Sequence, residues 1–348
     1  VMAPQPGVEI TTEKTIIRVE EFKKPGQVRS LTDILNEIGG IDVQRINPLM
    51  ASPGDEVSIR GLNEGRMVIE IDGRRINHTG HFGRYIVDWS SLNMDDIERI
   101  EIIRGGHSVL HPFAIGGVIN MITKKGKKTD DPTPDVGIKA GYGKYDTYSV
   151  SGSAEGGLKD AVGYHFSASR QETDGYLRNN FQENTSLNGH LSFYLPADAT
   201  FDFGVKWSGV DYGYPVINDP SRPDYDGDYP EFLQTADQLR HIPPVGQFPG
   251  VATPKWYRET TYWDGIFQIP AGPGTVKLHG FITTGMRWND YYRGPNFMSD
   301  YSDDKTQGII AEYRDIDLFD AHRVTLGCEY QTLGTFEDET YIVQSAYV

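Results

Sequence analysis

The stretch Ile97–Ser108 reads IERIEIIRGGHS and joins a short β-run to an abrupt glycine stop. Ile100 and Ile102 alternate with charged residues, as in a strand with one buried face. Arg104 closes the run directly before two glycines. Glycine allows a sharp turn or a close backbone approach that a side chain would prevent. The stretch therefore predicts a strand that ends at a corner of a compact unit.

Residues 8–128 around this stretch read as a mixed α/β unit. Ser30-Leu31-Thr32-Asp33 supplies a helix start, and Gly39-Gly40 ends the helix. Asp72-Gly73 is a strong turn signal after a β-run. Four further β-runs are predicted at Val8–Ile10, Thr15–Val19, Val57–Arg60 and Met67–Ile71.

Composition narrows the class of protein. Hydrophobic residues make up 38% of the 348 residues, charged residues 24%, and the mean hydropathy is −0.47. No run of about 18 apolar residues is present, which excludes a transmembrane helix. A membrane β-barrel is not excluded, because its strands alternate apolar and polar residues. The 39 glycines, 20 tyrosines and five tryptophans fit such a barrel, and they also fit a secreted carbohydrate-binding β-protein.

Charge and cysteine content exclude further classes. The formal net charge of −16 argues against nucleic acid as a partner. Cys328 is the only cysteine, so an intramolecular disulfide framework and a cysteine-based zinc site are excluded. Residues 1–10 lack the charged start and apolar core of a signal peptide.

Five segments, in order, resemble the plug of TonB-dependent outer-membrane receptors, a family of transporters. They cover about a third of the chain, and their order over some ninety residues makes the resemblance specific. The segments are Leu31–Val43 (LTDILNEIGGIDV), Val57–Leu62 (VSIRGL), Met67–Ile76 (MVIEIDGRRI), Ile97–Ser108 (IERIEIIRGGHS) and Ala114–Lys124 (AIGGVINMITK).

The resemblance implies that arginines of two plug motifs pair with glutamates of the barrel wall and hold the plug in place. In this sequence these arginines are Arg60 and Arg104. Glu312 and Glu329 point to the predicted lumen and are the candidate partners. A desolvated arginine–carboxylate pair is strong yet reversible, which suits a latch.

From Asp135 onward the hydrophobic pattern has a period of two. Phe201, Phe203, Val205 and Trp207 share one face of their run, opposite Asp202, Gly204, Lys206 and Ser208. Such alternation over nine or more residues is typical of a wall between lipid and a polar lumen, whereas sandwich strands are nearer 5–6 residues.

Nine strands are predicted, and short and long links alternate between them as at the two rims of an outer-membrane barrel. The short links are GGLKD, PADA, PAGP and DLFDAH; the longer ones follow the third, fifth and seventh strands, and one runs from Tyr214 to about Lys255. The predicted strands span 136–143, 145–155, 161–170, 184–195, 200–213, 258–269, 274–292, 305–317 and 323–336.

The expected fold is thus a mixed α/β plug domain at 1–130 inside a transmembrane antiparallel β-barrel whose N-terminal portion is 131–348. Plugged transporters have about 22 strands, so roughly 300 further residues are expected. Either the chain is a fragment of a longer polypeptide or a second chain completes the barrel. The TonB-binding box is expected at Val8–Thr11 or upstream of residue 1.

Two segments are candidate ligand sites. In the resembled family, ligand rests on outward plug loops and the inner wall, and the best plug candidates here are His78, His81, Phe82, Arg84 and Tyr85. The turn Asn47–Gly54 is a second candidate apex. In the Tyr214–Lys255 link, the carboxylates of Asp224, Asp226 and Asp228 suggest a calcium site, although a solvated acidic loop fits the same residues better.

The resemblance implies a transporter in the bacterial outer membrane that takes up a scarce nutrient and performs no chemistry on it, so it is not an enzyme. Its partners would be outer-membrane lipid, a periplasmic TonB-type protein and a small metal chelate. The expected ligand is a ferric siderophore first, and haem or cobalamin second. Iron is expected only as part of the transported ligand, and no cofactor is required. The alternatives are a plugged barrel that serves as a docking component of a larger complex, and a secreted carbohydrate hydrolase or lectin.

Overall fold

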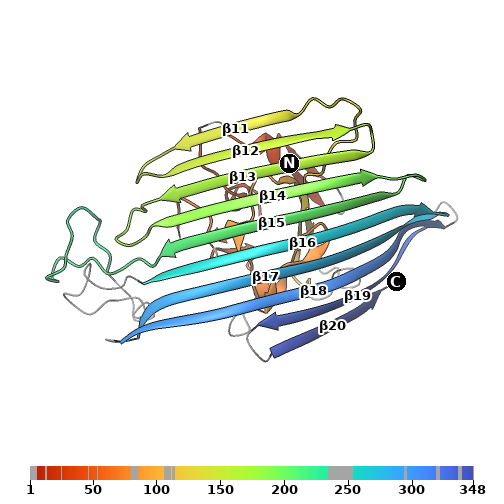
Figure 1. Ribbon diagram of the computed structural model, residues 1–348. Helices are drawn as coiled ribbons and strands as arrows, with labels where there is room; N and C mark the ends of the chain where they lie inside the picture. The colour runs from red at the N-terminus through yellow and green to blue at the C-terminus, as the bar shows by residue number, and fades with distance from the viewer. Residues whose placement is uncertain are drawn as a thin grey trace.

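The computed structural model consists of a small α/β domain seated against a large curved sheet (Figure 1). No helix among the described residues combines the length and the apolar character needed to cross a membrane. The structure describes residues 6–11, 14–24, 26–45, 47–52, 54–79, 85–105, 111, 114–233, 254–293, 296–318, 322–335 and 339–347.

The small domain, called the plug from here on, is built on a six-stranded sheet of order β1-β2-β9-β10-β5-β6. Only β10 and β5 pair in parallel; the other neighbours are antiparallel. Its sheet strands are β1 (Val8–Ile10), β2 (Thr15–Arg18), β5 (Val68–Ile71), β6 (Arg74–Arg75), β9 (Ile97–Arg104) and β10 (Gly117–Thr123).

Short helices and two separate hairpins complete the plug. The predicted helix is α1 (Leu31–Asn36), and Ser30 caps it in a capping box with Asp33, as the sequence indicates. The other elements are η1 (Val19–Phe22), β3 (Ile41–Gln44), β4 (Glu56–Ile59), η2 (Glu64–Arg66), β7 (His78–Thr79), β8 (Tyr85–Ile86) and η4 (Trp89–Ser91).

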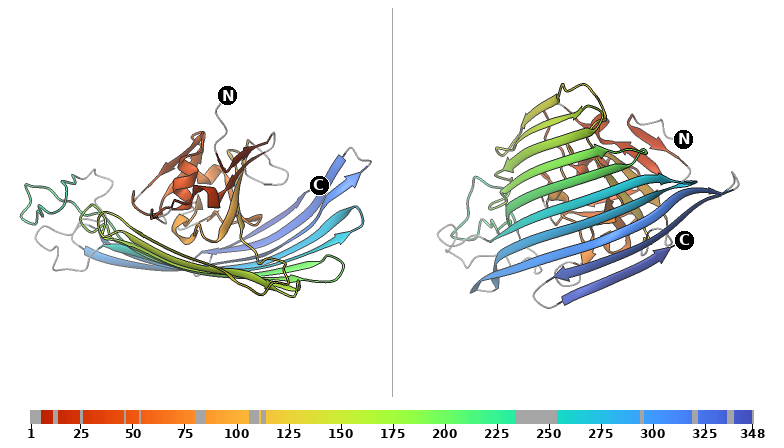
Figure 2. Two further views of the ribbon diagram at one scale, coloured as in Figure 1. Left: turned by 90° about the horizontal axis from the view of Figure 1, so that it is seen from above. Right: turned by 45° about the vertical axis from the view of Figure 1, so that its right-hand side comes forward.

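The apolar core belongs almost entirely to the plug. Side chains from α1 and from strands β2, β4, β5, β9 and β10 form one buried cluster, and among the described residues Tyr262 is its only member from the large sheet. Since burial of apolar surface is the main stabilising term in folding, the plug has its own source of stability. Figure 2 shows this domain lying on the concave side of the large sheet.

The large sheet, called the wall, has ten antiparallel strands in sequence order, with β11 and β20 at its edges. Strand length grows steadily from eight residues in β11 to 23 in β18. The strands are β11 (Asp135–Tyr142), β12 (Tyr148–Leu158), β13 (Val162–Thr173), β14 (Gln182–Tyr194), β15 (Thr200–Gly213), β16 (Lys255–Ala271), β17 (Gly274–Arg293), β18 (Asn296–Leu318), β19 (His322–Thr335) and β20 (Glu339–Tyr347).

The faces of the wall are those that the alternation predicts. Asp202 and Lys206 are buried toward the plug, whereas Phe201 and Phe203 are exposed on the other side. In β17, Lys277 and His279 face inward, and the side chains of the alternate residues face outward. The concave face is therefore polar and the convex face apolar.

Two strand predictions are wrong. The wall has ten strands rather than nine, because residues 339–347 pair with β19. The longer link expected after the seventh strand is instead part of an extended hairpin, in which β17 and β18 continue to Arg293 and Asn296. Cross-strand contacts explain the extension: Trp288 donates a 2.6 Å hydrogen bond to Ser299 and its ring meets that of Tyr301 edge-on.

Glu64 is a buried carboxylate that ties three parts of the plug together. It accepts hydrogen bonds from the backbone N–H groups of Val57 and Val87 and from Nε1 of Trp89, at 2.6–3.1 Å. Burial raises the pKa of Glu64 to about 7, because the charged form loses its hydration, although these donors partly oppose the shift.

We expect the plug to lose stability as the pH rises. A carboxyl group whose pKa is higher in the folded state stabilises the fold fully below its unfolded pKa, and this contribution disappears as the pH passes the folded value near 7. The free energy of unfolding should fall by about 2 to 3 kcal/mol between pH 5 and pH 8. Urea unfolding at each pH measures this free energy. The fluorescence of Trp89 reports on the plug alone when the four wall tryptophans are changed to phenylalanine.

The Glu64→Gln variant should lose most of this pH dependence, and Glu56→Gln, the same change at an exposed neighbour, should keep it. An unchanged pH profile in Glu64→Gln would show that Glu64 does not titrate in this range.

Candidate functional site

The interface between plug and wall is the candidate functional site, and Arg74 is its most deeply buried charge. Asp72 and Gly73 both have positive φ, at 52° and 84°, and form the predicted two-residue turn between β5 and β6. This turn conformation favours Asp-Gly, because both positions lie in the left-handed region. The turn places Arg74 at the surface of the plug that meets β16 and β17.

Arg74 enters a polar pocket of the wall and its side chain is fully buried. Its Nε lies 2.8 Å from Oδ1 of Asp264, and a terminal nitrogen donates a 2.8 Å hydrogen bond to Oγ1 of Thr283. His279 Nε2 lies 2.8 Å from the same Asp264 oxygen. The planar guanidinium suits this combination of a carboxylate and a hydroxyl.

Two aromatic rings complete the Arg74 contacts. The guanidinium carbon lies 4.9 Å from the ring centre of Phe281 and 5.2 Å from that of Tyr262. Cation–π attraction adds to the ion pair where water is excluded. We call Arg74, Asp264, His279 and Thr283 the Arg74 anchor.

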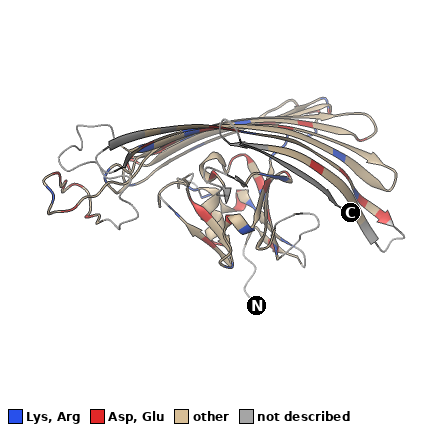
Figure 3. Ribbon diagram, turned by 90° about the horizontal axis from the view of Figure 1, so that it is seen from below, with Lys and Arg blue, Asp and Glu red and all other residues tan. Residues whose placement is uncertain are grey.

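Acidic residues of segment 88–96 in the plug meet basic residues of the wall. Oδ2 of Asp88 lies 3.2 Å from Nε of Arg258. Oδ2 of Asp96 lies 3.5 Å from Nζ of Lys206, and Ser167 also donates to Asp96. Opposite charges thus face each other across the interface, and Figure 3 shows charged residues of both signs on plug and wall.

Amide groups connect the Asn47–Gly54 turn to the wall. Gln182 at the start of β14 accepts hydrogen bonds from Asn47 at 3.2 Å and from Ser52 at 2.7 Å. Gln182 and Asn184 both donate to the carbonyl oxygen of Ala51. The turn that the sequence marks as a candidate apex is therefore attached to β14.

The two latch arginines, Arg60 and Arg104, lie near enough to each other for their charges to interact, and Arg104 bonds within the plug. Arg104 donates hydrogen bonds to Oγ1 of Thr15 at 2.6 Å and to the carbonyl of Gly39 at 3.3 Å. Burial lowers the pKa of Arg104, and the neighbouring charge of Arg60 lowers it further. Two neighbouring arginines make a cationic site that a carboxylate would stabilise. The role of Arg60 and Arg104 as a latch stays a prediction.

Glu312 lies at the interface between plug and wall, close to Lys277. Its Oε2 is 3.6 Å from Nζ of Lys277, and Lys277 donates to the carbonyl of Asp72 in the plug. Nearby, Nδ1 of His111 lies 2.9 Å from Glu70. Burial alone would lower the pKa of His111, but Glu70, with help from Glu312, raises it. Glu329 faces the same side of the wall and is half-buried.

The ligand candidates of the plug loop are only partly described. His78 lies in β7 and Tyr85 in β8, and the two strands pair with each other. His81, Phe82 and Arg84 lie outside the described residues. The role of all five in ligand binding stays a prediction.

The acidic run in the long link adopts a defined structure. Arg222 forms a two-pronged ion pair with Asp224, at 2.9 and 3.1 Å. Asp226 accepts from the backbone N–H of Asp228. No group of three or more histidine, cysteine or acidic side chains that could hold a metal ion occurs among the described residues. The calcium site stays a prediction, and its first carboxylate already has a partner.

A family model confirms the resemblance that the sequence motifs indicate. Residues 6–118 match the TonB-dependent Receptor Plug Domain, which is about a third of the chain. The chain therefore carries a plug domain of the TonB-dependent receptor family, followed by part of the wall of a plugged barrel.

Solved structures share this fold over nearly the whole chain. The unliganded ferric citrate transporter FecA matches with a TM-score of 0.72 at 18% identity, over 96% of this chain and 48% of that chain. The FrpB iron transporter from Neisseria meningitidis matches at 0.70 and 12%, over 95% and 49%. The ferric yersiniabactin uptake receptor FyuA from Yersinia pestis matches at 0.67 and 16%, over 98% and 50%. The chain thus spans about half the length of these proteins.

We expect the Arg74 anchor to hold the plug against the wall. Arg74→Met removes the charge and leaves the carboxylate of Asp264 buried without its main partner, which should cost about 3–5 kcal/mol. The loss is measurable as a lower urea midpoint for release of the plug from the wall, reported by energy transfer between dyes on the two parts.

Arg75→Met is the matched control, because it removes the same charge one residue away, from a side chain that bonds to Asn77 within the plug. Equal midpoints for the two variants would mean that the anchor contributes nothing to plug retention.

Proposed function

We propose that the protein is a receptor of the bacterial outer membrane that takes up a ferric chelate, of the siderophore class, with energy delivered by TonB. The observation that carries the proposal is the contrast between the apolar core inside the plug and the charged, hydrogen-bonded contacts between plug and wall. A plug held in this way can be displaced without exposing its apolar core.

The energetics support a reversible attachment. Each ion pair across the interface has lost hydration on forming, so its net contribution is much smaller than its Coulomb attraction. Water that enters as the plug shifts rehydrates Asp88, Arg258 and their neighbours, and this offsets the broken contacts. An apolar interface of the same size would resist entry of water, because its separation costs free energy in proportion to area.

The wall supports a place in the outer membrane. Its convex face carries exposed apolar and aromatic side chains, such as Leu278, Ile282 and Trp288, and its concave face is polar. This division is typical of a barrel between lipid and a hydrated lumen. The solved structures with this fold include a ferric citrate transporter and a ferric yersiniabactin uptake receptor, which favours an iron chelate over haem or cobalamin. They likewise favour uptake over a docking role.

Uptake should require TonB, whereas binding should not. Cells that lack their own iron receptors and express the full-length protein are supplied with ⁵⁵Fe as ferric citrate, a ferric catecholate or a ferric hydroxamate, with haem and cobalamin as further arms. One of the ferric chelates should accumulate, and accumulation should fall to background in cells without TonB. Surface binding at 0 °C should be equal in both strains.

Equal accumulation with and without TonB would contradict active transport. Accumulation of haem or cobalamin but of none of the ferric chelates would contradict the siderophore assignment.

A further inference from the structure

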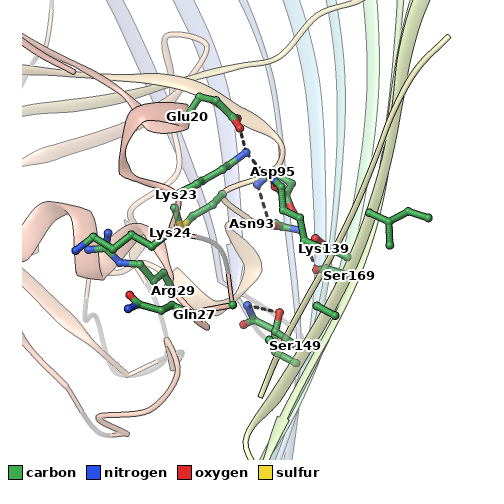
Figure 4. A pocket seen from close by; sticks show the side chains of 17 residues that line it. Glu20, Lys23, Lys24, Gln27, Arg29, Asn93, Asp95, Lys139, Ser149 and Ser169 are labelled. Carbon is green, nitrogen blue, oxygen red and sulfur yellow. Dashed lines mark hydrogen bonds and ion pairs between the residues drawn. The ribbon is translucent and has the colours of Figure 1, made fainter. Parts of the chain in front are cut away.

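A cavity of about 480 Å³ lies between the N-terminal part of the plug and the first wall strands. Residues between Glu20 and Arg29, together with the turn 93–95, line its plug side, and β11, β12 and β13 line its wall side (Figure 4). Small-molecule sites in proteins have volumes of roughly 300–1,000 Å³, so the cavity is large enough for a ligand. It is lined by none of the residues of the Arg74 anchor.

The lining of this cavity carries an excess of positive charge. Four cations face two carboxylates, in a chain whose formal net charge is −16. The cations are Lys23, Lys24, Arg29 and Lys139, and the carboxylates are Glu20 and Asp95. A cationic excess in a partly enclosed space attracts an anion, because the surrounding protein screens charge less than bulk water does.

Asp95 is shared between two of these cations. Its Oδ1 lies 2.9 Å from Nζ of Lys23 in the plug and 2.7 Å from Nζ of Lys139 in β11. Burial alone would raise the pKa of Asp95, but the two ammonium groups lower it, so the carboxylate is ionised at neutral pH. Nζ of Lys23 also lies 2.7 Å from Oε2 of Glu20, whereas Lys139 forms an ion pair with Asp95 alone among the described residues. Lys139 is therefore the ammonium group of this pair that can take a second anion.

Further donors surround this pair. Lys24 forms no ion pair with any other residue that the structure describes, whereas Arg29 is already paired with Glu37. Ser149 and Gln171 place a hydroxyl and an amide on the wall side, 3.5 Å apart. Ammonium, hydroxyl and amide groups together match an oxygen-rich anion, because each donates to carboxylate oxygens.

We propose that this cavity binds a small carboxylate-bearing anion, namely an anionic iron chelate in passage between plug and wall. The inference rests on the proposed uptake of ferric chelates, which supplies the ligand. Lys24 and Lys139 contact the carboxylates of the ligand, and Ser149 donates to them. Because Lys139 also holds Asp95, a ligand carboxylate replaces Asp95 at Lys139. Occupancy of the cavity thus loosens one contact between the plug and the wall.

Two variants with opposite expected effects test the site. Lys24→Gln removes a charge that meets the ligand and should weaken binding about tenfold, the effect of losing one charge-assisted hydrogen bond. Asp95→Asn removes the competing carboxylate and should strengthen binding several-fold. Lys159→Gln, in the exposed turn after β12, is the control and should leave binding unchanged.

The measurement is calorimetric titration of the purified full-length protein in detergent, with citrate and with ferric citrate as separate probes. Ferric citrate that binds most tightly to Asp95→Asn and most weakly to Lys24→Gln supports the proposed chelate site. If only citrate without iron shows this order of affinities, the cavity binds a free carboxylate and not an iron chelate. Weaker binding in both variants would indicate general loosening of the plug and overturn the proposal. Equal affinities in all variants would also overturn it.

The outcome is separable from that of the proposed function. If no ferric chelate is taken up but citrate binding follows the expected order, the uptake proposal fails and the cavity remains an anion site. If a ferric chelate is taken up but the Lys24→Gln and Asp95→Asn variants bind with unchanged affinity, only the cavity proposal fails.

Discussion

The constraint on which the rest of this structure depends is that buried polar groups must have partners. The concave face of the wall is lined with amides, hydroxyls and charges, and the plug covers them. An unpaired buried charge costs several kcal/mol, so each group on one surface restricts what can lie opposite it on the other. The position of the plug against the wall is therefore set mainly by complementary polar pairs, with Tyr262 as the described contribution of the wall to the apolar core.

This division separates two kinds of stability within one chain. The plug holds its shape through apolar side chains such as Leu31, Ile69 and Ile119, which are fully buried. It holds its place through Arg74 and through the acidic residues of segment 88–96. The two sets can respond to different conditions, because ionic contacts weaken with competing ions and with protonation, whereas apolar burial does not.

Local patterns in the sequence are sufficient to predict much of the fold. The capping box at Ser30, the Asp72-Gly73 turn and the alternation in β15 each involve residues close together in the chain. The Arg74 anchor is different, since Arg74 and Asp264 are 190 residues apart and their contact depends on how the plug sits in the wall. Its one local signal is an arginine directly after a tight turn, inside a motif that already indicates a plug. For the same reason Arg60 and Arg104 could be selected by motif, while their partners could not.

The steady lengthening of the strands has a geometric consequence for whatever approaches the plug. A membrane strand needs about 9–11 residues to cross an apolar layer; β11, with eight residues, is shorter than this, and β18, with 23, is more than twice as long. At about 3.3 Å per residue, β18 is roughly 50 Å longer than β11. The described wall is therefore much taller at β18 than at β11, and its strands shorten again to 14 residues in β19 and nine in β20. The space on the concave side is therefore bounded by a longer stretch of wall at β18 than at β11.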